Sequence, residues 1–312
     1  MKTFKKPNIV LSECINLAAT RYDGGLIKNE FAELLGKFVN YVPVCPEVSV
    51  GLPIPRDPII IVKDKEDVLF QPKSGRMLTK EMEEFSKNFL DALKDIDGFL
   101  LKGKSPSCGV KDTNLYSDYE GKNIIGKTSG MFARIVIEKF PDYPIEDEKR
   151  LIDRAVRELF LTKIFAFADI RELGNNLTKS NLIQFHSDYK LLLMTYNQKN
   201  LRLLGRLISN LKEENTDDIY KNYAEIFRGS FKKKPSKGSH VNTLLHAFGY
   251  FKDKISTKEK AHFLDVLEDF SKGRVDIHTP SEIIINFAIR FDEEYLLNQR
   301  YFVAYPKELS EV

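Results

Sequence analysis

The stretch Asn8-Ile9-Val10-Leu11-Ser12-Glu13-Cys14 decides the fold of the N-terminal half of this 312-residue chain. Its short apolar run is typical of a buried strand, and it ends in a polar turn that carries a thiol. The same order recurs twice, because residues 41–44 run directly into Cys45 and residues 98–101 precede the turn that carries Cys108. If the three runs are parallel strands, their carboxyl ends meet at one edge of a sheet, where open α/β sheets bind ligands. The sequence therefore predicts that the three cysteines of the chain share one crevice.

Short apolar runs alternate with helical patterns through the first half of the chain. Residues 8–12, 41–44, 58–62 and 98–101 are typical of buried strands, and residues 26–39 and 79–96 have apolar side chains at helical spacing. Such alternation indicates a parallel sheet with right-handed crossovers. The stretch 45–58 contains four prolines, so we expect it to be an ordered loop and not a strand.

The strand pattern stops after about residue 129. Helical patterns cover residues 131–140 and 146–171, and from there to the end they cover 178–198, 200–212, 216–229, 239–254, 256–271 and 280–299. We therefore predict an α/β N-terminal domain with a Rossmann-like parallel sheet over residues 1–174, which includes a long helix at its end. An all-α C-terminal domain is expected over residues 175–312.

The composition is that of an ordinary soluble globular protein, with 42% hydrophobic and 30% charged residues. No apolar run approaches the ~20 residues that span a bilayer, and the basic N-terminus lacks the apolar segment of a signal peptide. We expect a cytoplasmic protein without a membrane partner. In that reducing compartment, cysteines tend to be metal-binding or catalytic.

Positive charge is concentrated in the middle of the predicted helical domain. The net charge of the whole chain is +3, yet residues 181–262 hold 15 basic against 8 acidic side chains. Beside Phe227 and Phe231 lies a group of cations that a phosphate backbone would attract, namely Arg228, Lys232, Lys233, Lys234 and Lys237. Most such basic runs are only a solvated surface, which is the alternative interpretation. The local excess of positive charge gives a nucleic-acid partner about equal weight.

The turns around the cysteines favour a metal centre over inert core thiols. Proline, serine and glutamate flank Cys45 and Cys108, and polar groups on a kinked backbone suit a hydrophobic core poorly. Structural zinc sites usually take cysteines in close pairs, which this chain lacks. Three isolated thiolates suit an iron–sulfur cluster in which one iron has no protein ligand. Zinc and three buried, inert thiols remain the alternatives.

Several polar side chains are candidates for catalysis or substrate binding beside this centre. Glu47 lies two residues beyond Cys45 and would act as a general base next to a Lewis acid, unless it is only a solvated loop carboxylate. Ser105 and Ser107 would donate hydrogen bonds to substrate or cluster sulfur, or else hold the turn at Pro106. The turn Arg21-Tyr22-Asp23-Gly24-Gly25 offers further recognition groups.

One motif suggests nucleotide hydrolysis, but its context makes this activity a minor alternative. Gly121-Lys122-Asn123-Ile124-Ile125-Gly126-Lys127-Thr128 satisfies the P-loop pattern. A P-loop follows a buried strand, whereas residues 115–120 are polar and do not have the pattern of a strand.

The cysteine motifs together resemble the TudS-type thiouracil desulfidases over roughly residues 8–150. The resemblance rests on Ser12-x-Cys14, Arg21-Tyr22-Asp23-Gly24, Pro43-Val44-Cys45-Pro46-Glu47, Pro55-Arg56-Asp57-Pro58 and Ser105-Pro106-Ser107-Cys108-Gly109. The C-terminal half resembles the helical YbgA-like domain through Phe185-His186-x-x-x-Lys190, Leu204-Gly205-Arg206, Asn242-x-x-x-His246 and Gln299-x-Tyr301. The fused arrangement is similar to the RudS-type desulfidases, which remove sulfur from thiouridine in tRNA.

The resemblance implies a 4Fe–4S cluster held by Cys14, Cys45 and Cys108. It also implies that Glu47 and Ser105 are catalytic, and we expect Ser12, Arg21, Tyr22, Asp23 and Ser107 to contact the substrate. The expected activity is non-redox removal of sulfur from a thiouracil-type base, with 4-thiouridine in tRNA giving uridine and hydrogen sulfide. The expected partners are a thiolated pyrimidine and tRNA, and no obligate protein partner is evident. The alternatives are another three-cysteine 4Fe–4S enzyme, such as a dehydratase or sulfur transferase, and a tRNA-binding protein with a structural metal.

Overall fold

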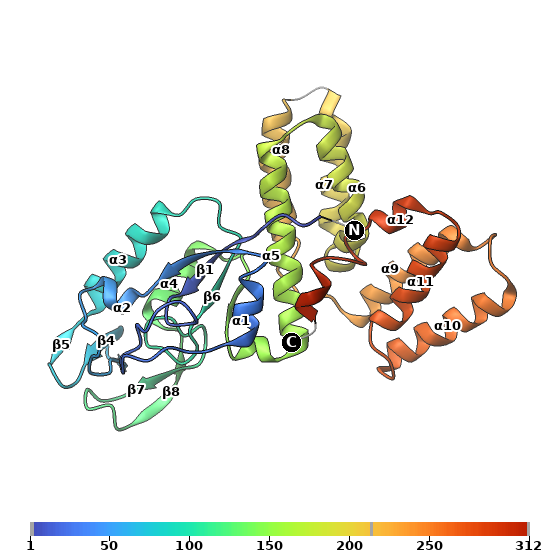
Figure 1. Ribbon diagram of the computed structural model, residues 1–312. Helices are drawn as coiled ribbons and strands as arrows, with labels where there is room; N and C mark the ends of the chain where they lie inside the picture. The colour runs from blue at the N-terminus through green and yellow to red at the C-terminus, as the bar shows by residue number, and fades with distance from the viewer. Residues whose placement is uncertain (1–2, 213–214, 311–312) are drawn as a thin grey trace. The chain divides into compact units, whose positions relative to one another are not determined.

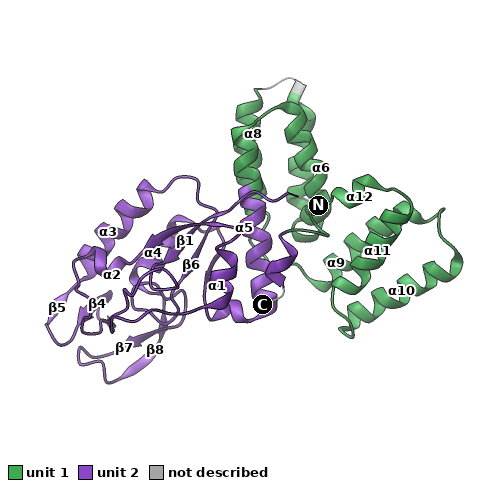
Figure 2. Cartoon of the chain, viewed as in Figure 1, with its two compact units in different colours: residues 1–2, 169–304 green, residues 3–168, 305–312 purple. Residues whose placement is uncertain are grey.

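The computed structural model describes residues 3–212 and 215–310 and divides into two compact units (Figures 1 and 2). The sheet unit comprises Thr3–Ala168 and Tyr305–Val312, and the helical unit comprises Met1–Lys2 and Asp169–Ala304. The division falls inside helix α5 (Arg154–Asn175), a few residues before the expected domain boundary after residue 174. Tyr305 and Leu309 pack into the core of the sheet unit, although the sequence pattern grouped them with the helical half.

A four-stranded, all-parallel sheet forms the centre of the sheet unit. Its strand order is β2-β1-β6-β9, with β1 at Asn8–Ser12, β2 at Asn40–Val44, β6 at Gly98–Leu101 and β9 at Ile145–Asp147. The apolar residues of β1 and β6 are fully buried, as expected for parallel strands covered on both faces. β1 lies between β2 and β6, so the prediction that these three runs are parallel strands of one sheet is confirmed.

Helices cover both faces of this sheet (Figure 1). On one face, α3 (Thr79–Ala92) and α4 (Met131–Lys139) pack against Val10, Phe99 and Leu101. On the other face, α1 (Glu30–Leu35) and the first turns of α5 pack against the opposite side chains of the same strands. α1 is shorter than the predicted 26–39 helix, because the Asn29 side chain accepts a hydrogen bond from the Ala32 amide and caps the helix there.

A second, mixed sheet corrects three sequence expectations. Its order is β5-β4-β3-β7-β8, with bounds β3 Ile60–Lys63, β4 Asp67–Gln71, β5 Arg76–Met77, β7 Thr113–Tyr116 and β8 Ile124–Thr128. The strand predicted at 58–62 exists as β3, but it pairs with β4 and β7 and does not join the parallel sheet. The β4–β5 and β7–β8 hairpins were not predicted, because their apolar runs are at most three residues long. The P-loop-like pattern ends inside β8, so it is not a phosphate loop, although a strand does precede it.

β9 and the start of α5 correct the helix predicted at 146–171. Residues 145–147 pair with β6, and the helix begins only at Arg154. The Asp153 carboxylate accepts hydrogen bonds from the amides of Ala155 and Val156 and so caps the helix at its true start. The short strand forms because an edge of the parallel sheet is available, which no local pattern reveals.

The helical unit contains the rest of α5 and seven further α-helices among its described residues. They are α6 (Lys179–Tyr196), α7 (Gln198–Ser209), α8 (Thr216–Gly229), α9 (Lys237–Phe248), α10 (Thr257–Lys272), α11 (His278–Arg290) and α12 (Glu294–Asn298). Within this unit His186 bonds the hydroxyl of Tyr223 and His240 bonds that of Tyr301, each at 3.0 Å. Burial lowers the pKa of both imidazoles to about 4, so they are neutral packing residues at pH 7.

The predicted fold class, an α/β region with a parallel sheet followed by an all-α region, is confirmed. Every helix within residues 3–212 and 215–310 is too short or too polar to cross a bilayer.

Candidate active site

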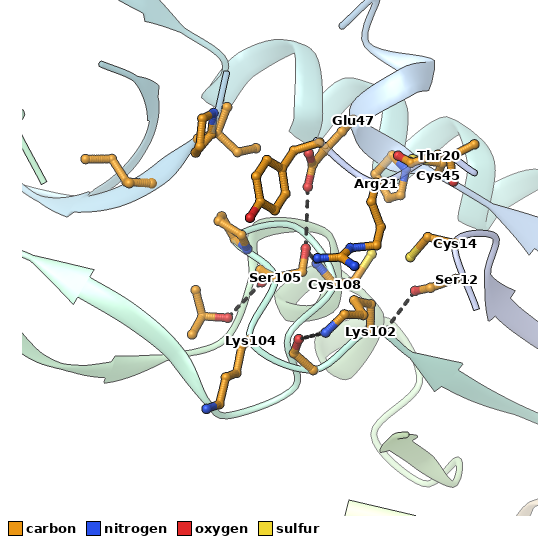
Figure 3. Close-up of a pocket in the computed structure, with 18 of the residues that line it drawn as sticks. Ser12, Cys14, Thr20, Arg21, Cys45, Glu47, Lys102, Lys104, Ser105 and Cys108 are labelled. Carbon is orange, nitrogen blue, oxygen red and sulfur yellow. Dashed lines mark hydrogen bonds between the residues drawn. The ribbon is translucent and has the colours of Figure 1, made fainter. Parts of the chain in front are cut away.

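The carboxyl ends of β1, β2 and β6 open into a cavity of about 560 Å³ that all three cysteines line. Cys14 lies two residues beyond β1, Cys45 follows β2 directly, and Cys108 lies in the turn-rich loop after β6. Figure 3 shows the three side chains on the same side of the pocket. The geometry brings together thiols that lie up to 94 residues apart in the chain, since 108 − 14 = 94.

Burial dominates the electrostatics of these thiols. It raises the pKa of Cys14 to about 12 and that of Cys45 and Cys108 above the ordinary value, and the neighbouring cysteines raise the pKa of Cys14 and Cys108 further. The Ser12 hydroxyl hydrogen-bonds the Cys108 side chain and acts in the opposite direction. With pKa values above that of an ordinary thiol, the three side chains are protonated at neutral pH. A cationic centre would compensate the charge of three thiolates if it bound here.

The three cysteines form the donor set of this cavity. All three are free of disulfides and line the same cavity. Thiolates that come from three separate loops fit a cluster that takes each of them on a separate iron.

Glu47 lies in the first turn of α2 (Pro46–Ser49), directly after Cys45, and its side chain lines the same cavity. Arg56 Nε donates to Glu47 Oε2 at 2.8 Å, and Ser107 Oγ donates to Oε1 at 3.0 Å. Ser105 Oγ is 3.4 Å from the same Oε1. A carboxylate has about four lone-pair sites, so a carboxylate held by three donors still has one for a water or substrate proton.

Arg56 is a site residue that the sequence interpretation did not single out. Its side chain is 3% exposed, and it donates to the Thr20 carbonyl at 2.9 Å as well as to Glu47. Its backbone amide donates to the Tyr22 carbonyl at 2.7 Å. Arg56 thus connects the loop after Cys14 to the loop after Cys45. These contacts order the stretch 45–58, as its prolines predict. The sequence signals were a charged residue among closely spaced prolines and its place in the Pro55-Arg56-Asp57-Pro58 motif of the family resemblance, neither of which assigned it a role.

The loop that carries Cys108 is held by hydrogen bonds of its own and by the N-terminus of α4. Ser105 Oγ accepts hydrogen bonds from the amides of Ser107 and Cys108, at 3.2 and 3.1 Å. The amides of Gly130, Met131 and Ala133 donate to carbonyls of Gly109, Pro106 and Ser107. Ser107 is fully buried and does not line the cavity, so its hydroxyl orients Glu47 from behind, whereas Ser105 faces the cavity.

Gly130 allows α4 to approach this loop, and replacing it should disrupt the site. A Cβ at this position would lie 2.5 Å from the carbonyl carbon and oxygen of Ser107. We expect Gly130→Ala to lower the free energy of unfolding by about 1–3 kcal/mol through overpacking, and to reduce iron retention after anaerobic reconstitution. Urea unfolding and iron analysis measure the two effects.

Gly126→Ala is the matched control for this substitution. A Cβ on Gly126 in β8 would meet no atom within 4 Å, so stability and iron content should stay at the wild-type level. Equal behaviour of the two variants would contradict the importance of the close approach at Gly130.

The remaining predicted substrate contacts lie at different depths. Ser12 is buried within the cavity lining and accepts a hydrogen bond from the Lys102 amide at 2.9 Å. Arg21 and the exposed Tyr22 line the cavity, and the Arg21 guanidinium lies over the Tyr22 ring. Asp23 lies outside the lining and pairs with Arg21 at 3.0 Å.

The basic segment of the helical unit has exposed cations but buried aromatics. Lys232, Lys233 and Lys234 are exposed in the turn after α8, and Lys237 is exposed at the start of α9. Arg228 is half-buried in α8. Phe227 and Phe231 are fully buried and pack edge to face in the core of the unit, so they cannot stack on bases. This corrects the grouping of these rings with the lysines as one binding surface.

Comparisons with known proteins agree with the two-part architecture. Residues 9–148 match the family described as 2-thiouracil desulfurase, and residues 190–306 match a family described as a protein of unknown function, DUF1722. Uncharacterized protein YbbK of Bacillus subtilis (strain 168) is 31% identical over 154 residues, which are 46% of this chain and 98% of YbbK. Uncharacterized protein YbgA of Escherichia coli (strain K12) is 26% identical over 152 residues, which are 48% of this chain and 90% of YbgA.

A solved structure of a protein titled 4Fe–4S-dependent thiouracil desulfidase TudS covers 49% of this chain and 98% of its own, at 24% identity and a TM-score of 0.38. The family match spans the strands that carry all three cysteines, and almost the whole of YbbK aligns with this chain. The chain that forms the cavity at the ends of β1, β2 and β6 thus belongs to the 2-thiouracil desulfurase family, and its C-terminal region belongs to the DUF1722 family.

Proposed function

We propose that this protein is a 4Fe–4S-dependent desulfidase that replaces the sulfur of a thiouracil-type base with oxygen by hydrolysis. The observation that carries the proposal is the single cavity lined by three free cysteines and a hydrogen-bonded carboxylate, Glu47. Membership of the 2-thiouracil desulfurase family supports the substrate class.

The chemistry divides between the cofactor and the chain. A cluster bound by Cys14, Cys45 and Cys108 would supply an iron without a protein ligand, which is a Lewis acid for a thiocarbonyl sulfur. Glu47 takes a proton from the water that attacks the ring carbon. Arg56 and Ser107 fix the direction of the carboxylate, and Ser105 bonds it weakly from the cavity side. The carbon–oxygen bond forms, the carbon–sulfur bond breaks and sulfur leaves as hydrosulfide, so no electron is transferred overall.

4-Thiouridine in tRNA is the proposed natural substrate, with the helical unit as the tRNA-binding part. The exposed lysines at 232–234 and 237 and the excess of basic residues over 181–262 support a polyanionic partner. A free thiouracil base would need only the cavity of the sheet unit.

The direct test is sulfide release after anaerobic reconstitution, with 4-thiouracil and with tRNA that contains 4-thiouridine as substrates. We expect sulfide and the oxygenated pyrimidine in equal amounts, and faster turnover of the tRNA at low concentration. A reconstituted protein that binds iron and tRNA but releases no sulfide from either substrate would contradict the desulfidase proposal and favour tRNA binding with a structural metal.

A fourfold variant tests the tRNA surface. Changing Lys232, Lys233, Lys234 and Lys237 to Ala should weaken tRNA binding and flatten its logarithmic salt dependence by up to about four contacts of roughly 0.7–0.9 each. Turnover of 4-thiouracil, which carries no phosphate, should stay unchanged. Filter binding at several salt concentrations measures the slope.

The double variant Lys258→Ala and Lys260→Ala is the control. These two lysines are exposed on α10, so their substitution removes positive charge from another part of the same unit. If the fourfold variant slows both substrates equally, the segment is structural. If it changes neither, the tRNA surface lies elsewhere.

A further inference from the structure

An ion pair borders the cysteine cavity at the carboxyl ends of β6 and β9. Lys102 follows β6 directly and lines the cavity, and Glu148 follows β9 directly. Lys102 Nζ lies 3.0 Å from Glu148 Oε1, and the two side chains are 20% and 6% exposed. The sequence interpretation did not single out either residue.

The pair is held in place from several directions. Lys102 Nζ also donates to the Gly103 carbonyl, and Glu148 Oε2 accepts from the Gly103 amide at 2.7 Å. The Lys102 amide donates to Ser12 Oγ, and the Ser12 hydroxyl hydrogen-bonds the Cys108 side chain. A buried carboxylate needs such partners, because an unpaired one would carry a large desolvation cost.

The charges of the pair act on the cysteine ligands. The Lys102 ammonium stabilises negative charge at Cys14, and the Glu148 carboxylate opposes it with a smaller effect. An ammonium has three donors, and Glu148 and the Gly103 carbonyl occupy two of them, so one is left for the cavity that Lys102 lines. Net charge close to a cluster is one of the factors that set its reduction potential.

We propose that Lys102 and Glu148 are positioning residues that set the charge environment of the cluster, with Lys102 stabilising its more negative state and Glu148 opposing that effect. The inference rests on the proposed function, since it requires a cluster on the three cysteines. The inference assigns the electrostatic tuning of the cluster to residues at the ends of β6 and β9, whereas Glu47 is the proposed general base.

The test compares Lys102→Met and Glu148→Gln in the full-length chain after anaerobic reconstitution. Iron and sulfide analysis gives cluster content, and a titration followed by electron paramagnetic resonance gives the midpoint potential. Lys102→Met should bind less iron and shift the potential of the remaining cluster to more negative values. Glu148→Gln should shift it to less negative values, because it removes an anion and keeps the side-chain shape.

Opposite signs distinguish the charge effect from structural damage, which would act alike in both variants. If Lys102→Met retains no cluster, the upward shift in Glu148→Gln still decides. Lys104→Met is the matched control, because Lys104 also lines the cavity but is exposed, so that solvent screens its charge. It should shift the potential less than Lys102→Met does.

Shifts of the same sign, or no shift in Glu148→Gln, would overturn the role of the pair. A wild-type chain that binds no cluster would overturn it together with the proposed function. Iron analysis of the wild type alone separates these two failures.

Discussion

Replacing any one of Cys14, Cys45 and Cys108 with serine is expected to abolish both the brown absorbance of the reconstituted protein and its sulfide release. The three thiols line one cavity from three different strand ends, so no other cysteine can substitute for a lost one. A serine hydroxyl is a poor ligand for iron compared with a thiolate. Absorbance spectra and iron content per chain after anaerobic reconstitution measure the first effect, and sulfide assays the second.

Ser49→Ala controls for a small change beside the site, because Ser49 is exposed at the end of α2. It should bind iron and turn over as the wild type does. Full iron content in a Cys→Ser variant would contradict the assignment of that ligand. A fourth protein ligand in a cluster-loaded crystal structure would contradict an iron that is open to substrate.

Glu47→Ala should retain the cluster and lose turnover by on the order of a hundredfold or more, the usual cost of losing a general base. Glu47 is held by Arg56, Ser107 and Ser105 beside the thiols, and the proposed cluster takes its protein ligands from the three cysteines. Glu47→Gln should behave similarly, because an amide keeps the shape but cannot take the proton. Iron content and kcat, measured on the same preparation, separate a loss of cluster binding from a loss of catalysis.

Arg56→Met should have an intermediate effect on kcat, because it removes the ion pair that fixes the carboxylate and leaves the carboxylate itself. Glu81→Gln, an exposed position on α3, is the remote control. Iron content and turnover both near the wild-type level in Glu47→Ala would mean that another group activates the water.

The cysteine positions were predictable because each thiol follows an apolar run whose strand character is local. Val10, Phe99 and their neighbours are buried on both faces of the sheet, and such burial leaves a clear hydrophobic pattern. The polar β7–β8 hairpin and the three-residue β9 leave no such pattern, because they form only where another strand is available to pair with. Their residues nevertheless line or border the cavity: Asn114 and Tyr116 lie on β7, and Glu148 follows β9.

The charged partners of the site were less predictable than its ligands. Arg56 meets Glu47 only because the loop at 45–58 folds back, and Lys102 meets Glu148 across neighbouring strands separated by 46 residues, since 148 − 102 = 46. Side chains brought together by the fold have no fixed spacing that a sequence pattern could reveal. For the same reason Phe227 and Phe231, adjacent to exposed lysines in the chain, are part of the core.

The most direct measurement of the central claim follows the oxygen atom during turnover of 4-thiouracil in water enriched in oxygen-18. If the cavity of Cys14, Cys45, Cys108 and Glu47 hydrolyses the carbon–sulfur bond, each uracil formed by the reconstituted protein carries one oxygen from that water and is matched by one sulfide. The same protein without its cluster forms neither product. Sulfide release without incorporation of the labelled oxygen, or equal turnover with and without the cluster, would contradict the account.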